Sequence, residues 1–182
     1  MSTNGKAKRG LSIFRAADAV NLSETDLMSP PEMSEETRAA ANDRLAAGLS
    51  AGTEAKVVVR QNDDEGGFSL LRLWFKANYP LARHTHDSDC LYYVLSGSIV
   101  MGRQTLRAGD AFFVPDGAPY QYDAGPDGVE VLEIRRNVAQ FDMKIFDARA
   151  EQWRAMTETV QTNHERWASM PTSPTMVANR AP

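Results

Sequence analysis

The chain has 182 residues, enough for one domain with appendages and for a hydrophobic core that needs neither disulfides nor a structural metal. Its apolar share of 42% and charged share of 24% are those of an ordinary globular protein. The net charge of −4 argues against nucleic-acid binding, and no apolar run is long enough to cross a bilayer. We therefore expect neither a nucleic-acid nor a membrane partner.

The cellular compartment is suggested by two further features. Cys90 is the one cysteine, which rules out an internal disulfide and fits a reducing environment. Residues 1–9 are polar and basic, and no apolar stretch follows them as it would in a secretory signal. A cytoplasmic location is the resulting expectation.

Residues 1–55 are expected to form an N-terminal arm and a helix. Ser34 precedes Glu35 and Glu36, and this order is typical of a helix that begins with a side-chain cap and acidic residues in its first turn. Gly48 or Gly52 is expected to end that helix.

In residues 56–146, short runs of β-branched and aromatic residues are separated by turn residues every eight to twelve positions. This pattern predicts an all-β domain, an antiparallel sandwich or barrel. A C-terminal helix is expected over residues 147–170, capped by Asp147, with an apolar stripe at spacings of three and four that is made by Trp153, Met156, Val160, His164 and Trp167. Residues 171–182 are rich in Pro, Ser and Thr and are expected to be a flexible tail.

The most informative stretch is residues 83–97, which holds two of the three histidines and the cysteine. Residues i and i+2 of a strand share a face, so His84 and His86 are expected to point the same way. Cys90 and Tyr92 continue that face unless a bulge intervenes. Two imidazoles and a thiolate are ligands that suit Zn, Cu or Fe and do not suit Mg or Ca.

Two segments resemble the motifs of the cupin superfamily. The first cupin motif runs glycine, five residues, His-x-His, three or four residues, glutamate, six residues, glycine. Here it reads Asn78, five residues, His84-Thr85-His86, three residues, Cys90, six residues, Gly97. Asn replaces a glycine at the start, and Cys90 stands where the family has its carboxylate ligand.

The second cupin motif runs glycine, five residues, Pro-x-Gly, two residues, histidine. Here it reads Gly109, five residues, Pro115-Asp116-Gly117, two residues, Tyr120, so that a tyrosine replaces the third histidine. Together the motifs cover about half of the chain. The resemblance implies an antiparallel cupin-type jelly-roll barrel, here with an N-terminal helical arm and a C-terminal helix.

The resemblance also implies one divalent transition metal (Fe, Zn or Cu), and the residues at the matching positions are His84, His86, Cys90 and Tyr120. Tyr92 and Tyr120 would act as general acid or base beside it. The alternative is a vacated site, in which Cys90 and Tyr120 only pack. In cysteine dioxygenases, which are also cupins, a cysteine placed like Cys90 is cross-linked to a tyrosine, and this remains a further alternative.

Other residues are candidates for the substrate pocket. Tyr122 shares a face with Tyr120, whereas Arg72 and Trp74 alternate with apolar residues, and the sequence does not say which set faces inward. Glu133 is either an inward carboxylate or part of a surface alternation. His164 is either a packed helix residue or the missing third imidazole.

The sequence thus predicts a cupin-type enzyme of the dioxygenase, lyase or isomerase class, which acts on a small oxygenated organic molecule, aromatic or planar, through a metal at His84 and His86. The alternative is a metal-free or degenerate cupin that binds a small ligand. A homodimer is expected, because a barrel edge is open and Trp153 and Trp167 form an aromatic stripe. A transcription regulator is disfavoured, because the sequence has no recognition helix.

Overall fold

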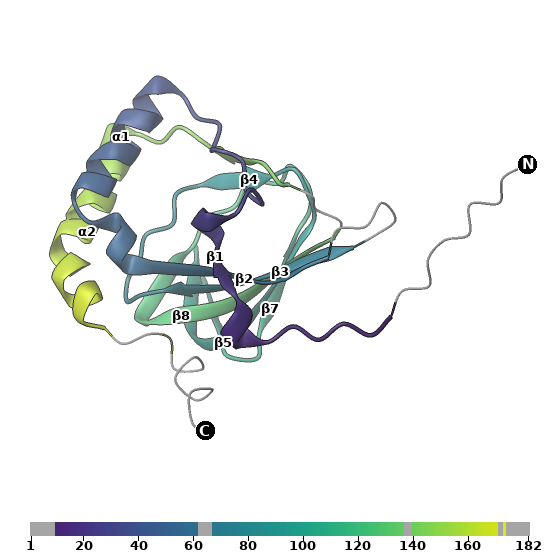
Figure 1. The fold of residues 1–182 in the computed structure, drawn as a ribbon. Helices are drawn as coiled ribbons and strands as arrows, with labels where there is room; N and C mark the ends of the chain where they lie inside the picture. Colours follow the sequence, from purple (N-terminus) through teal and green to yellow (C-terminus); the bar gives the residue numbers. More distant parts are fainter. Residues whose placement is uncertain (1–9, 62–66, 137–139, 171–172, 174–182) are drawn as a thin grey trace, which may run out of the picture.

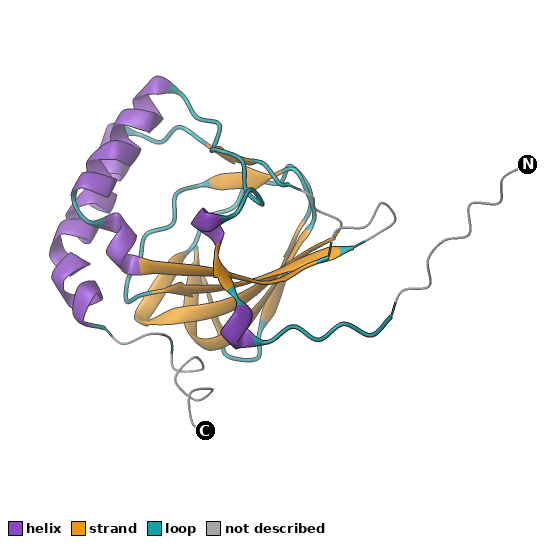
Figure 2. Ribbon diagram, in the orientation of Figure 1, coloured by secondary structure: helices purple, strands orange, loops and turns teal. Residues whose placement is uncertain are grey.

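The computed structural model describes residues 10–61, 67–136, 140–170 and 173. They form an antiparallel β-barrel with two helices packed beside one end of it (Figures 1 and 2). In chain order the elements are η1 (Ala16–Asp18), β1 (Val20–Asn21), η2 (Leu22–Glu24), α1 (Glu35–Ala46), η3 (Leu49–Gly52), β2 (Thr53–Arg60), β3 (Phe68–Phe75), β4 (His84–His86), β5 (Cys90–Met101), β6 (Gln104–Arg107), β7 (Ala111–Val114), β8 (Asp123–Arg136), β9 (Met143–Ile145) and α2 (Ala150–Ser169).

The large sheet has the strand order β1-β2-β3-β8-β5-β6, and β7 also pairs with β5. Strands β4 and β9 form a small second sheet, and every pairing between these strands is antiparallel. An antiparallel bridge joins His84 to Tyr120 and so brings the two predicted motifs together. The expected all-β, cupin-type jelly-roll fold is confirmed by this pairing.

The strands are longer than the sequence suggests where glycines allow the backbone to bend. β5 continues through Ser96 and Gly97, and its register with β8 shifts there. Gly97 has φ 72°, and a Cβ at this position would lie 2.0 Å from the carbonyl oxygen of Gly128, so only glycine fits. Asn78, which replaces the first glycine of the motif, adopts φ 58° as a glycine would.

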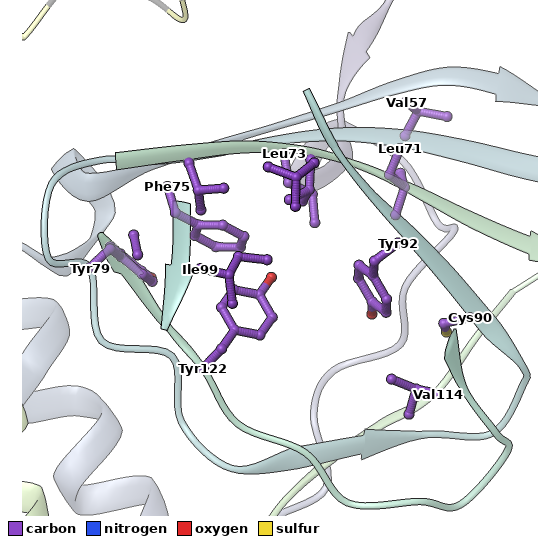
Figure 3. Packing of buried hydrophobic residues seen from close by; sticks show 14 of the residues in the cluster. Val57, Leu71, Leu73, Phe75, Tyr79, Cys90, Tyr92, Ile99, Val114 and Tyr122 are labelled. Carbon is purple, nitrogen blue, oxygen red and sulfur yellow. The ribbon is translucent and has the colours of Figure 1, made fainter. Parts of the chain in front are cut away.

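The interior of the barrel is filled by alternate residues of the long strands. Leu71, Leu73 and Phe75 of β3 point inward and meet Tyr92 of β5 and Tyr122 (Figure 3). The neighbours Arg72 and Trp74 therefore lie on the other face of β3, because side chains alternate along a strand.

The N-terminal helix begins as expected and is tied to a distant segment. Ser34 Oγ accepts a hydrogen bond from Thr37 N at 3.1 Å, and Gly48 follows the helix with φ 101°. Asp147 was predicted to cap the C-terminal helix, but that prediction is wrong. Its carboxylate instead accepts hydrogen bonds from Ser34 and Thr37 at the start of α1, which lower the pKa of Asp147.

Helix α2 begins at Ala150, and Gln152 Oε1 in its first turn accepts a hydrogen bond from Arg149 N at 3.0 Å. Its apolar stripe packs on this chain's own barrel and on α1. Trp167 is fully buried, donates from Nε1 to the carbonyl of Ala77 at 2.8 Å and lies 5.6 Å from the ring of Tyr79, while Trp153 lies under the guanidinium of Arg44. These tryptophans are not free for a partner, and the homodimer stays a prediction.

The predicted flexible tail lies outside the described residues, apart from Ser173, as do residues 1–9 of the arm. Among the residues described, no helix combines the length and the apolar character that crossing a membrane would require.

Replacing Trp167 with alanine is expected to lower the free energy of unfolding by roughly 3–5 kcal/mol, because a fully buried indole and its hydrogen bond are lost. Urea denaturation followed by circular dichroism measures this change. The control is Glu165→Ala, which alters an exposed position of the same helix and should change the value by less than about 0.5 kcal/mol. Equal effects of the two substitutions would show that α2 does not contribute to the barrel's stability.

Candidate functional site

The two motif histidines lie on β4 and point into the barrel. His84 and His86 are both buried, and their ring centroids are 5.1 Å apart. The backbone of His84 exchanges two hydrogen bonds with Tyr120, at 3.0 and 2.9 Å, which fixes the second motif against the first. The prediction that the imidazoles share one face is confirmed, since Thr85 between them is directed to the carbonyl of Ala118 instead.

Each imidazole is oriented by a backbone carbonyl. His84 Nδ1 lies 2.8 Å from the carbonyl oxygen of Ala82, and His86 Nδ1 lies 3.1 Å from that of Asp142. A carbonyl only accepts, so both Nδ1 atoms carry the proton and both Nε2 atoms present a lone pair. Within the described part of the chain, the lone pair of His86 Nε2 has no hydrogen-bond donor.

A chain of hydrogen bonds leads from β5 to His84. Tyr120 Oη lies 2.8 Å from His84 Nε2, so the phenol donates to the imidazole. Tyr92 Oη makes a short hydrogen bond to Tyr120 Oη. The aromatic ring of Tyr92 stacks on Phe112 at 4.5 Å, which holds the hydroxyl in place. The two tyrosines and His84 therefore form one proton-conducting chain.

Burial makes these groups neutral. It is the largest cause of the lowered pKa of His84, to about 4, and of His86, to about 3, and the positive charge of Arg135 lowers both further. Burial likewise raises the pKa of Tyr92 and Tyr120 well above the ordinary phenol value. The site at neutral pH therefore holds two neutral imidazoles and two protonated phenols.

A cavity of about 240 Å³ lies inside the barrel against these side chains. Its polar wall contains His84, His86, Tyr120, Tyr122, Glu133 and Arg135, and its apolar wall includes Leu71, Leu73, Phe75 and Phe141. A larger apolar cavity of about 530 Å³ beneath α1 shares His84, Met28 and Met143 with it. The two cavities therefore share part of their walls.

The structure adds a buried ion pair to this wall. Glu133 and Arg135 of β8 form a salt bridge through Nη2 of the arginine, and both side chains are at least 95% buried. Glu133 is thus the inward carboxylate of the two alternatives. Sequence reasoning missed Arg135, although both residues follow Val131 at steps of two, and Val131 would be inward in any half-buried strand.

The remaining candidates are placed as follows. Tyr122 lines the cavity as predicted, whereas Arg72 and Trp74 do not: Arg72 pairs with Glu130 on the other face of the sheet. Cys90 is a buried free thiol that does not line the cavity; its Sγ donates to the carbonyl of Ser88 at 3.3 Å. His164 packs against Gly48 and is not the third imidazole.

His84, His86 and Tyr120 are the side chains of this wall that could hold a transition metal. Two neutral Nε2 atoms oriented by carbonyls are typical of histidine ligands, and Tyr120 Oη lies 2.8 Å from one of them. The Cys90 thiol donates to the carbonyl of Ser88 and Glu133 pairs with Arg135, so neither side chain is counted among the possible metal donors. No group of three His, Cys, Asp or Glu side chains that would hold a metal occurs among the described residues.

No protein-family model and no curated protein matches the chain. Several solved structures match part of it. KdgF from Halomonas sp. is 22% identical, with a TM-score of 0.40, over 46% of this chain and 78% of that one. An RmlC-like cupin from Shewanella frigidimarina is 22% identical, with a TM-score of 0.42, over 49% and 79%. The polyketide cyclase RemF from Streptomyces resistomycificus is 21% identical, with a TM-score of 0.47, over 61% and 82%. Similarity at this level implies no activity.

Metal-free protein is expected to lose stability as the pH falls from 7 to 5. The folded histidines stay neutral in this range, whereas those of the unfolded chain bind protons below pH 6.5, so acid favours unfolding. The two together should contribute a loss of roughly 3 to 4 kcal/mol.

Urea unfolding at both pH values, in the presence of a chelator, measures the loss in wild type and in His84→Gln/His86→Gln. The double variant should lose less stability by that amount. The control Thr85→Ser, between the two histidines, should behave as wild type. An equal pH dependence in the double variant would contradict the assignment of two neutral buried imidazoles.

Proposed function

We propose that this chain is a cupin-type enzyme that moves a proton on a small oxygenated aromatic molecule bound in the barrel cavity. The observation that carries the proposal is the chain Tyr92–Tyr120–His84, which ends at a cavity that also receives the unpaired Nε2 lone pair of His86. Of the expected reaction classes, this arrangement favours lyase or isomerase chemistry, in which proton transfer is the central step.

The cavity supports a molecule with one substituted ring. A cavity of roughly 150 Å³ is enough to hold benzene, so about 240 Å³ leaves room for oxygen-bearing substituents. Aromatic side chains form part of the wall, namely Phe75, Tyr79, Tyr120, Tyr122 and Phe141. Such rings favour a planar ligand through stacked and edge-on contacts.

The proposed roles follow from the protonation states. His86 Nε2 is an acceptor without a donor among the described residues and would take a proton from the substrate as general base. Tyr120 holds its proton firmly and would turn its single O–H from His84 Nε2 to a substrate carbonyl oxygen that gains negative charge, while Tyr92 donates a hydrogen bond to the Tyr120 oxygen. Tyr92 is fully buried and Tyr120 is partly buried, and hydrogen bonds in such surroundings are stronger than in water.

A divalent transition metal is compatible with this site. His84, His86 and Tyr120 would hold it, and as a Lewis acid it would polarise a substrate oxygen. Tyr120 would then have to give up its proton, which the cation would favour by lowering the pKa of the phenol.

A second candidate function is a metal-free module that binds a small ligand. It is supported by the hydrogen bond from Tyr120 to the His84 lone pair that a metal would need. In that case Tyr120 completes the lining of the cavity, and no chemistry occurs there.

Metal titration tests whether the site holds a cation. Protein purified without a nickel column should bind about one equivalent of Zn²⁺ or Co²⁺ by calorimetry, and His84→Ala/His86→Ala should bind none, because the two firm donors are gone. Tyr120→Phe should bind at least about 10-fold more weakly if the phenol is a ligand. His164→Ala, which removes the histidine outside the site, is the control and should bind as wild type. Absence of binding to wild type would argue against a metal site and would leave the metal-free acid–base site and the ligand-binding module.

Proton transfer can be detected directly with phenylpyruvate, an aromatic acid whose carbonyl acidifies the neighbouring C–H bonds. In D₂O the wild-type protein should accelerate deuterium uptake above the buffer rate, as measured by proton NMR, and His86→Gln should reduce the acceleration by roughly 10²-fold or more. Tyr120→Phe should reduce it as well. Tyr93→Phe is the matched control, since Tyr93 lies on the same strand as Tyr92 and points to the outer face. No acceleration by wild type would argue against the enzyme.

A further inference from the structure

Arg135 has hydrogen-bonding capacity that the described residues leave largely unused. The residue is 1% exposed, and its Nη2 atom pairs with Glu133. The Nε and Nη1 atoms are buried and make no well-aligned hydrogen bond among the described residues, although the Arg135 side chain interacts with the thiol of Cys90. These two atoms carry three of the five N–H bonds of an arginine, and leaving buried donors unpaired is unfavourable.

The guanidinium is held so that its edge faces the cavity. Its carbon atom lies 3.7 Å from the centroid of the Phe141 ring, so one face is covered by an aromatic side chain. The salt bridge to Glu133 fixes a second side. Arg135 nevertheless lines the cavity, together with His84, His86 and Tyr120. A group of the ligand is therefore the missing partner of the free N–H bonds.

We infer that Arg135 binds the carboxylate of a small aromatic acid inside the barrel. This inference rests on the proposed function for the cavity and names the chemical class of its ligand. A carboxylate is planar, accepts several hydrogen bonds and matches a guanidinium better than a neutral amide does. Glu133 holds the guanidinium in place and offsets its charge, so a monocarboxylate is favoured over a more highly charged anion.

Arg135 lines the same cavity as His84, His86 and Tyr120. A carboxylate bound at its guanidinium would therefore hold the attached ring within the space that these side chains enclose.

The probes are benzoate and its neutral counterpart benzamide, titrated by calorimetry. Wild type should bind benzoate at least about 10-fold more tightly than benzamide. Glu133→Gln removes the competing carboxylate, and benzoate should bind this variant more tightly than wild type. Glu133→Gln/Arg135→Gln keeps the pair neutral and close to its original volume, and its preference for benzoate should disappear.

The matched control is Arg72→Gln/Glu130→Gln, which removes an arginine–glutamate pair from the other face of the same sheet. Its preference for benzoate should equal that of wild type. If Glu133→Gln does not fold because it leaves a buried charge unpaired, the Glu133/Arg135 double variant decides, since it removes both charges. Circular dichroism establishes which variants are folded.

Three results would overturn the inference: no preference for benzoate in wild type, an unchanged preference in the folded double variant, or no gain in affinity for Glu133→Gln. Its failure is separable from failure of the proposed function. A protein that accelerates deuterium uptake but does not prefer benzoate keeps the acid–base site and loses the carboxylate site. One that prefers benzoate without accelerating exchange keeps Arg135 as a binding residue only.

Discussion

One buried guanidinium sets the electrostatics of the barrel interior. The charge of Arg135 acts on six buried or partly buried side chains around it: it lowers the pKa values of His84 and His86, and it opposes the pKa increases at Cys90, Tyr92, Tyr120 and Tyr122. Glu133 is the carboxylate that makes this charge tolerable. Removing one member of such a pair costs about 3–5 kcal/mol, whereas replacing both by apolar residues is often neutral or stabilising. The ion pair is therefore poorly explained by stability and better explained by what the cavity has to bind.

Much of the fold could be predicted from local patterns. Ser34 capped a helix as its sequence context suggested, Gly97 and Asn78 took the left-handed conformations that their motif positions require, and His84 and His86 share a face because they are two residues apart in a strand. Pairing between distant segments could not be predicted. The sequence predicts that Asp147 caps the helix that follows it. Its carboxylate instead accepts hydrogen bonds from Ser34 and Thr37, which lie far from it in the sequence.

The candidate site was predicted in part for a similar reason. Alternation along a strand shows that residues form two sets, but it does not show which set faces inward. On β3 the apolar set is inward, so Arg72 and Trp74 are not in the cavity. On β8 the inward set contains Glu133 and Arg135, against the usual rule that charged residues face water. Positions where a folded chain breaks that rule are often functional, and only the pairing of β8 with β3 and β5 reveals the break.

The position of Tyr120 is where the two candidate functions diverge. Its backbone bridges to His84, so the hydroxyl is held near Nε2 whatever the cavity contains. At 2.8 Å, the two atoms can share a proton or share a cation, and the phenol is protonated in one case and ionised in the other. Burial raises the pKa of Tyr120, so the proton is retained unless a cation compensates. Cys90, behind this wall, has a thiol pKa raised by burial and packs without ligating. Tyr120 thus completes a hydrogen-bond chain without metal, and this chain could accept a metal at the expense of one proton.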